Sequence, residues 1–351
     1  MKKILKLYLG LFVFSLILSG CGGDSSKDII TKMDNKIKNA NSYFVTGTME
    51  IINNEDTYTY DVSVSYKKDS YYKVDLINTL NNHEQVILRN DEGVYVVTPS
   101  LNKSFKFQSD WPYNNSRIYL LDSIIEDLKS DKKMEFKSDN KKYILSSLVN
   151  YPNNKSLYKQ NVYVDKNNNI TNVEIVDKNN KVQISMKFNK VKYNKKFNDD
   201  YFNLSSLIKV NNKVNDNNSE SSDNNTDGNE DKKTKETTKI DDVIYPMYLP
   251  DNTTLANKEV IDTEDGQRLI LTFDGDNPFV LVEETSKYYD EGLVVPVSGD
   301  LDFTNDVIGV VSDNSLTWES NGIEYYLVSK TMETSELMNI ARSINILPVS
   351  K

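Results

Sequence analysis

The chain has 351 residues with 42 Lys plus Arg, 52 Asp plus Glu, one His and one Cys, and its formal net charge is -10. This length predicts two domains, because a single core rarely grows beyond about 250–300 residues. One His and one Cys exclude a two-histidine or four-cysteine zinc site, a cysteine-held iron–sulfur cluster and an intramolecular disulfide. The folded parts must therefore be held together by their hydrophobic cores.

The beginning of the chain has the pattern of a secretory signal. Basic residues, among them Lys6, precede an apolar run over residues 7–18, and the small residues Ser19 and Gly20 then precede Cys21. This order resembles the lipobox of bacterial lipoproteins, with an ordinary signal peptide or an N-terminal anchor as the alternative. The resemblance implies a signal peptide over 1–20, cleavage between Gly20 and Cys21, and a lipidated tether over 21–27. It also implies a lipid-anchored location on the extracytoplasmic face of the cell membrane.

The charge of the mature part limits the classes of partner. Removing residues 1–20, which hold three Lys and no acid, changes the net charge from -10 to -13. Phosphate backbones and anionic lipid headgroups repel such a protein. We therefore expect no nucleic-acid partner, and we expect membrane contact through the lipid on Cys21.

A polar stretch divides the mature chain. Residues 211–239 are almost entirely Asn, Asp, Ser, Glu, Lys and Thr, with Val214 as the single large apolar residue. Such a segment cannot bury enough surface to offset the entropy cost of ordering it. We predict a disordered linker over 208–240 between a first domain over 28–207 and a second domain over 241–351.

The first domain begins with a helix and continues as strands. Ile29, Met33 and Ile37 recur at helical spacing after Asp28, which we expect to be the N-cap. The apolar period then changes to two, and Asn-, Asp- and Gly-rich breaks separate the strands. A second amphipathic helix is predicted over 116–129. The pattern predicts an antiparallel meander with one helix before it and one helix inserted.

Three stretches of this domain resemble the LolA superfamily of lipoprotein carriers. They are the strand Phe44–Met49, the hairpin Arg89–Pro99 and the closing run Val162–Phe202. The resemblance implies an α+β fold: an antiparallel half-barrel with capping helices over an apolar cavity that receives acyl chains or a protein segment. Lipobox-bearing relatives of this kind include sporulation lipoproteins of the YdcC type and germination lipoproteins of the GerS type.

Aromatic and β-branched residues are the candidates for the lining of that cavity. Alternate residues of the strand over 58–66 share one face, and aromatic residues of neighbouring strands extend the set. Core packing is the alternative for each of them. The candidate lining residues are Tyr58, Tyr60, Val62, Val64, Tyr66, Tyr71, Tyr95 and Phe107.

The sequence offers no convincing catalytic or metal site. We expect His83 to be an exposed turn residue and the acidic stretch Asp300–Asp306 to be a solvated loop without the pattern of a calcium site. Glu283 and Glu284 are adjacent on a predicted strand, so they point to opposite faces and cannot act as a pair. We therefore predict no catalytic residues, no metal and no cofactor.

The second domain is predicted to be a smaller α+β unit. Its Tyr248–Asp251 motif resembles a small extracytoplasmic domain of sporulation lipoproteins and anti-sigma-factor ectodomains. The dipeptide Asn321-Gly322 predicts a tight hairpin. A helix is expected from Thr334 or Ser335 onward, with one apolar stripe over Leu337, Ile340, Ala341 and Ile344.

Three functions remain open on these grounds. We favour a non-enzymatic, membrane-anchored envelope lipoprotein, an accessory factor in sporulation or germination that binds a protein partner such as a cell-wall hydrolase, or an acyl-chain ligand. The alternative is an RseB-like envelope-stress sensor that acts on an anti-sigma factor. A hydrolase with a perturbed pair of carboxylates is the third, and the sequence gives it no positive sign.

Overall fold

The structure is a computed structural model that describes residues 25–53, 56–139, 142–209, 240, 243–304 and 306–344. The predicted signal peptide, Cys21 and nearly all of the predicted linker lie outside these ranges. Within them, we find no helix whose length and hydropathy would let it span a membrane.

The first half of the chain supplies two helices and eleven strands in its described part. They are α2 (Ser26–Lys38), β1 (Ser42–Asn53), β2 (Asp56–Lys67), β3 (Tyr71–Asn78), β4 (Glu84–Asn90), β5 (Gly93–Thr98), β6 (Lys103–Phe107), α3 (Leu121–Ser130), β7 (Glu135–Asp139), β8 (Lys142–Leu148), β9 (Lys159–Val164), β10 (Ile170–Val176) and β11 (Val182–Tyr193).

The second half supplies the remaining strands and one helix. They are β12 (Thr253–Thr263), β13 (Gly266–Gly275), β14 (Phe279–Thr285), β15 (Leu293–Val297), β16 (Asp300–Phe303), β17 (Ile308–Val311), β18 (Ser315–Ser320), β19 (Ile323–Val328) and α4 (Thr334–Arg342).

Helix α2 begins three residues earlier than the sequence suggested. The Ser25 hydroxyl accepts a hydrogen bond from the Asp28 amide at 3.2 Å, and the Asp28 carboxylate accepts one from the Ser25 amide at 3.1 Å. This reciprocal pair is a capping box. The expectation that Asp28 is the N-cap was therefore wrong, because Ser25 takes that position and Asp28 serves it from the first turn.

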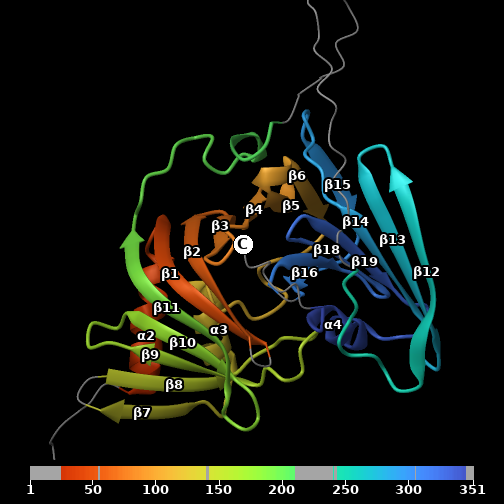
Figure 1. Ribbon diagram of the computed structural model, residues 1–351. Coiled ribbons are helices and arrows are strands. Elements are labelled where there is room, and N and C mark those ends of the chain that lie inside the picture. Colours follow the sequence, from red (N-terminus) through yellow and green to blue (C-terminus); the bar gives the residue numbers. More distant parts are fainter. Residues whose placement is uncertain are drawn as a thin grey trace, which may run out of the picture.

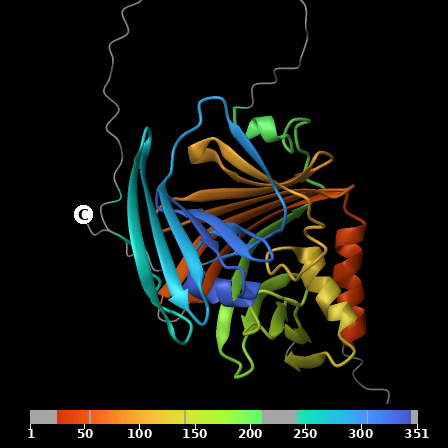
Figure 2. The ribbon, with the colours of Figure 1, turned by 90° about the vertical axis from the view of Figure 1, so that its right-hand side faces the viewer.

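The first sheet is strongly curved and has twelve strands, in the order β15-β6-β5-β4-β3-β2-β1-β11-β10-β9-β8-β7. All neighbours except β15 and β6 are antiparallel. Helices α2 and α3 lie together on its concave side (Figures 1 and 2). This arrangement agrees with the predicted meander and half-barrel. The second helix, predicted over 116–129, begins only at Leu121, so the prediction was wrong for residues 116–120.

The two faces of this sheet bury different clusters. On the concave side, α2, α3 and residues of β1–β5 and β8–β11 form the main core. On the convex side, the segment that follows β11 covers β4 and β5 with Phe202, Leu204 and Ile208. Strands buried on both faces have continuous apolar runs in place of alternation, as in Val86-Ile87-Leu88 and Val94–Val97.

The second sheet is antiparallel and has seven strands, in the order β12-β13-β14-β19-β18-β17-β16. Helix α4 packs on it through Leu337, Met338, Ile340 and Ala341, which are fully buried. The turn between β18 and β19 uses Asn321 and Gly322 at φ 50° and 80°. Both the tight hairpin and the packed terminal helix were predicted from the sequence and are confirmed.

The two halves of the chain are interlocked. Strand β15 belongs to the second half, yet it pairs in parallel with β6 at the edge of the first sheet. Leu301, Ile308 and Val310 are buried within the core of the first half. The Gln85 side chain also bonds both backbone groups of Ile308, at 2.9 and 2.6 Å. The second half therefore closes over the open side of the half-barrel.

Candidate functional site

Six of the eight candidate lining residues lie on the concave side. Tyr60, Val62, Val64 and Phe107 are buried there, and Tyr58 and Tyr66 pack against the same cluster. The strand alternation that placed Tyr58 to Tyr66 on one face therefore corresponds to the observed pleat.

Tyr71 and Tyr95 belong to the opposite, convex cluster. Neighbouring residues of a strand point to opposite faces, so Tyr72, Val94 and Val96 take the concave positions instead. The structure thus does not bring these two tyrosines into the concave site. The hydroxyl of Tyr72 donates to the Asp122 carboxylate at 2.7 Å, and that of Tyr43 donates to it at 2.9 Å.

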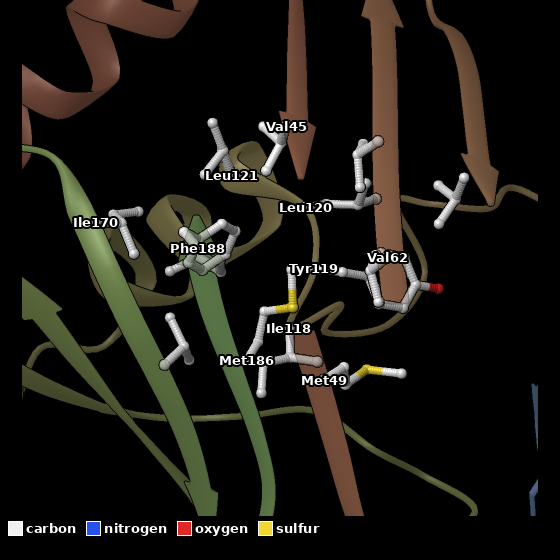
Figure 3. Close-up of a cluster of buried hydrophobic side chains, with 14 of the residues drawn as sticks. Val45, Met49, Val62, Ile118, Tyr119, Leu120, Leu121, Ile170, Met186 and Phe188 are labelled. Carbon is white, nitrogen blue, oxygen red and sulfur yellow. The ribbon is translucent and has the colours of Figure 1, made fainter. Parts of the chain in front are cut away.

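The concave face is filled by the protein itself. The segment Ile118–Leu121, which leads into α3, inserts its side chains between those of β1, β2 and β11 (Figure 3). The space left beside Ile118 and Tyr119 has a volume of about 30 Å³. A space of this size has room for a few water molecules at most, since one water needs about 10–15 Å³ on a comparable measure. An acyl chain could enter only if this segment moved out.

An open groove of about 400 Å³ lies at the mouth of this core, between the first sheet and α4. Its walls come from the end of β1, the start of β11, the loop over 151–157, the end of β16 and one face of α4. Cross-strand pairing of β1 with β11 sets Ile51 beside Ile184 on the apolar wall. The groove is lined by Ile51, Ile52, Asn53, Tyr151, Asn153, Asn154, Lys155, Ser156, Leu157, Gln183, Ile184, Asp302, Phe303, Ser335, Asn339 and Arg342.

Arg342 is the cation at the inner wall of this groove. Its guanidinium donates to the carbonyl oxygens of Asn153 and Phe303, both at 3.4 Å. Burial lowers the pKa of Arg342, and the nearby Asp302 partly offsets that effect. No described carboxylate lies within ion-pair distance of Arg342. The carboxylate of Asp302 accepts hydrogen bonds from the Asn153 side chain at 3.1 Å and from the Phe303 amide at 2.8 Å.

Two faces of helix α4 make different contacts. Its apolar face packs on the second sheet, whereas Ser335, Asn339 and Arg342 follow one another at spacings of four and three residues and face the groove. The apolar stripe of α4 was predicted from the sequence, and this polar one was not. The same helical period would have revealed it. The loop over 151–157 carries no comparable sequence signal.

A group of buried ionisable side chains lies in the contact between the two sheets. Asp306 and Glu319 are 8% and 7% exposed. Burial raises the pKa of Asp306 and raises that of Glu319 to about 7. The imidazole Nε2 of His83 lies 3.5 Å from the Glu319 carboxylate, and burial lowers the pKa of His83. His83 does occupy a turn, but the expectation that it is exposed was wrong because the second sheet covers it.

The acidic stretch Asp300–Asp306 also differs from a solvated loop. Most of it forms β16, and Asp300 accepts hydrogen bonds from Ser109 at 2.7 Å and from Asn114. Within the described ranges, no three His, Cys, Asp or Glu residues are grouped so that they could hold a metal ion.

The pair Glu283 and Glu284 is arranged as predicted. Glu283 is fully buried, with one carboxylate oxygen 3.4 Å from the Ile244 amide and its pKa raised by burial to about 7. Glu284 faces the other way and forms an ion pair with Arg268 at 2.8 Å. These two carboxylates cannot act on one substrate.

The chain is similar to two solved structures from other bacteria. The complex of the CwlD amidase with the GerS lipoprotein from Clostridioides difficile matches with a TM-score of 0.30 and 18% identity, over 50% of this chain and 99% of the matched chain. The LolA superfamily protein NE2245 from Nitrosomonas europaea matches with a TM-score of 0.32 and 12% identity, over 53% of this chain and 100% of its own.

The sequence comparisons extend over nearly the whole chain. A family model described as "Sporulation protein YdcC-like" matches residues 1–202. Over 348 residues the chain is 33% identical to the sporulation protein YdcC of Bacillus subtilis (strain 168), and the match covers 98% of both chains. The resemblance to YdcC-type proteins that the sequence suggested is thereby confirmed. The chain belongs to the family of YdcC-like sporulation proteins.

Proposed function

We propose that this protein is a non-enzymatic accessory factor of the sporulating cell envelope, and that it binds a protein partner in the groove between the first sheet and α4. The observation that carries the proposal is the contrast between two spaces. In the concave core, the space beside Ile118 and Tyr119 is about 30 Å³ and that beside Met33 and Leu121 is about 10 Å³, whereas the groove at its mouth offers about 400 Å³. Ligand-binding pockets in proteins typically have volumes of roughly 300–1,000 Å³. The groove falls within this range, and the space left in the core is far below it.

The walls of the groove suit a peptide segment better than an acyl chain. The groove presents the apolar side chains of Ile51, Ile184 and Phe303 together with the amides of Asn53 and Asn339. Amide side chains both donate and accept hydrogen bonds, so they can satisfy the backbone of a bound peptide.

Membership in a family of sporulation proteins supports a role in sporulation, and the pattern around Cys21 supports an envelope location. In this proposal the lipid on Cys21 holds the protein at the extracytoplasmic face of the membrane. Labelled palmitate should be incorporated into the parent and not into the Cys21→Ser variant. Fractionation alone does not decide this, because an uncleaved apolar run over 7–18 would also hold C21S in the membrane. A parent without label would contradict lipid anchoring and would not bear on the groove.

The groove can be tested by site-specific photo-crosslinking in sporulating cells. We would place p-benzoylphenylalanine at Asn339, in the groove, and at Tyr288, an exposed aromatic residue elsewhere on the surface. We expect one discrete crosslinked protein from position 339 and not from position 288. Equal crosslinking from both positions would contradict the proposal.

A groove-filling substitution provides the matched control. Ser335→Trp places an indole in the groove, whereas Ser205→Trp places the same group at an exposed position in the segment after β11. The S335W variant should lose the crosslinked partner, and S205W should retain it. An unchanged crosslink in S335W would show that the partner binds elsewhere.

A further inference from the structure

Arg342 has more hydrogen-bonding capacity than the protein uses. A guanidinium carries five N–H donors in a planar fork. In the described structure, the two hydrogen bonds from this group go to neutral carbonyl oxygens and are long, at 3.4 Å. Charge-assisted hydrogen bonds to a carboxylate are typically shorter, about 2.7–2.9 Å. The protein itself therefore does not use the full hydrogen-bonding capacity of the Arg342 guanidinium.

The charge in the groove is also unbalanced. Arg342 and Lys155 line it together with a single acid, Asp302. The carboxylate of Asp302 already accepts hydrogen bonds from Asn153 and Phe303. A protein with a net charge of -10 thus exposes a locally cationic groove. This arrangement complements an anionic group on a ligand.

From these observations we infer that the groove recognises a carboxylate on an otherwise apolar peptide segment, with Arg342 and Lys155 holding the carboxylate. Ile51, Ile184 and Phe303 contact the apolar side chains of the segment. The carboxylate belongs either to the end of the peptide chain or to an Asp or Glu side chain. This inference rests on the proposed function and specifies the chemistry of the same groove.

The binding experiment uses the mature chain with Cys21→Ser and three pools of fluorescein-labelled hexapeptides. All pools have uncharged variable positions and two apolar residues at the end. The first ends in a free carboxylate, the second ends in an amide, and the third ends in an amide but carries one internal Glu. Fluorescence anisotropy should show binding of the first or the third pool, and about tenfold weaker binding of the second. The carboxylate pool that binds identifies the source of the charge.

Variants of the cations test the assignment. Arg342→Gln should weaken binding about tenfold or more, and Arg342→Lys should recover only part of it because an ammonium lacks the planar fork. Lys155→Gln, in an exposed loop position, should also weaken binding without affecting the fold. Arg268→Gln removes an exposed arginine on β13 and should leave binding unchanged. Thermal unfolding of each variant shows whether Arg342 is needed for folding.

Several results would overturn the inference. They are equal binding of all three pools, binding of none, or unchanged binding in both R342Q and K155Q. Competition by dodecanoate as strong as that by the peptides would overturn the peptide assignment. If S335W abolishes the crosslinked partner while carboxylates make no difference, the proposed function stands and this inference fails.

Discussion

Glu319 is an acid held between the two sheets without a full set of hydrogen bonds. One of its carboxylate oxygens accepts from the Gly322 amide at 3.1 Å, and the other has no hydrogen-bond partner. The charged and titratable groups around it are Asp306, Glu324, Lys103 and His83. A buried carboxyl in these surroundings is more stable in its protonated form.

The free energy of unfolding should therefore fall as the pH rises from about 4.5 to about 7. The pKa of Glu319 rises on folding from 4.5 to about 7, so the folded state binds the proton more tightly than the unfolded chain. The stabilising contribution is complete below about pH 4.5 and is lost as the pH passes through about 7. Glu319→Gln remains neutral and should be more stable than the parent by about 1–3 kcal/mol at pH 8.5, with little difference at pH 5. Urea unfolding at both pH values measures this.

The control for Glu319 is an exposed glutamate. Glu291→Gln lies on the surface and should change stability equally at both pH values. The lowered pKa of His83 acts in the opposite direction below its ordinary value of 6.5. Because His83 contacts Glu319, the comparison at pH 8.5, where the imidazole is neutral in the folded and the unfolded state, is the one that reports on Glu319 alone. If E319Q changes the free energy of unfolding by the same amount at pH 5 and at pH 8.5, the Glu319 carboxyl of the parent is not protonated in the folded protein.

Individual residues also show the limit of sequence analysis. His83 lies in a turn, as its Asn- and Glu-rich neighbourhood indicated, but its burial comes from Glu319, more than 200 residues later in the sequence. Arg342 reaches the groove because α4 lies against the end of β1. Local periodicity predicts such elements. It cannot predict which distant element covers them.

At the scale of elements, strand β1 changes register against β11 between Thr46 and Gly47. A Cβ added at Gly47 would overlap the Lys187 carbonyl oxygen and come within 2.6 Å of the Met186 methyl group. Backbone atoms of a paired strand cannot move aside easily. We expect Gly47→Ala to destabilise the protein by about 1–3 kcal/mol. Thr48→Ala, one residue on, should cost less than about 1 kcal/mol. Similar unfolding midpoints for the two variants would contradict the close approach.

The segment before α3 decides whether the half-barrel can hold a ligand. Leu120 is fully buried among the concave side chains. Leu120→Ala should destabilise the protein by about 2–5 kcal/mol and leave a cavity. A dansylated fatty acid should not bind the parent, whose cavity is about 30 Å³, and binding should increase in L120A. Strong binding by the parent would show that the segment leaves the core readily, as a carrier requires.

Element types were predictable where one period dominated. The strand over 58–66 and the apolar stripe of α4 follow clean periods of two and 3.6. Strands β4 and β5 were harder, because both faces are covered and their apolar runs have no alternation. That is why Tyr95 was grouped with Tyr60 although the two lie on opposite faces of the sheet.

The whole molecule depends on contacts that the two-domain interpretation did not include. The polar composition of residues 211–239 predicts a linker between two separate domains. The structure joins them through the β15–β6 pairing and the burial of Leu301, Ile308 and Val310 in the first core. The sequence pattern did not reveal that β15 is an edge strand paired with β6. Parallel pairing between distant segments leaves no local signal in the sequence.

These contacts predict that the linker can be cut without separating the halves. A specific protease site inserted within residues 215–230 lies outside the described structure, so cleavage should leave every described contact intact. The two fragments should co-elute as one species in size-exclusion chromatography and unfold in a single transition. Ile308→Asp places an unpaired charge in the shared core and should release the fragments after cleavage. Leu255→Asp, on exposed strand β12, should leave them together. Separate elution of the cleaved parent would show that the two halves are independent domains, and the groove between them would then lack a fixed geometry.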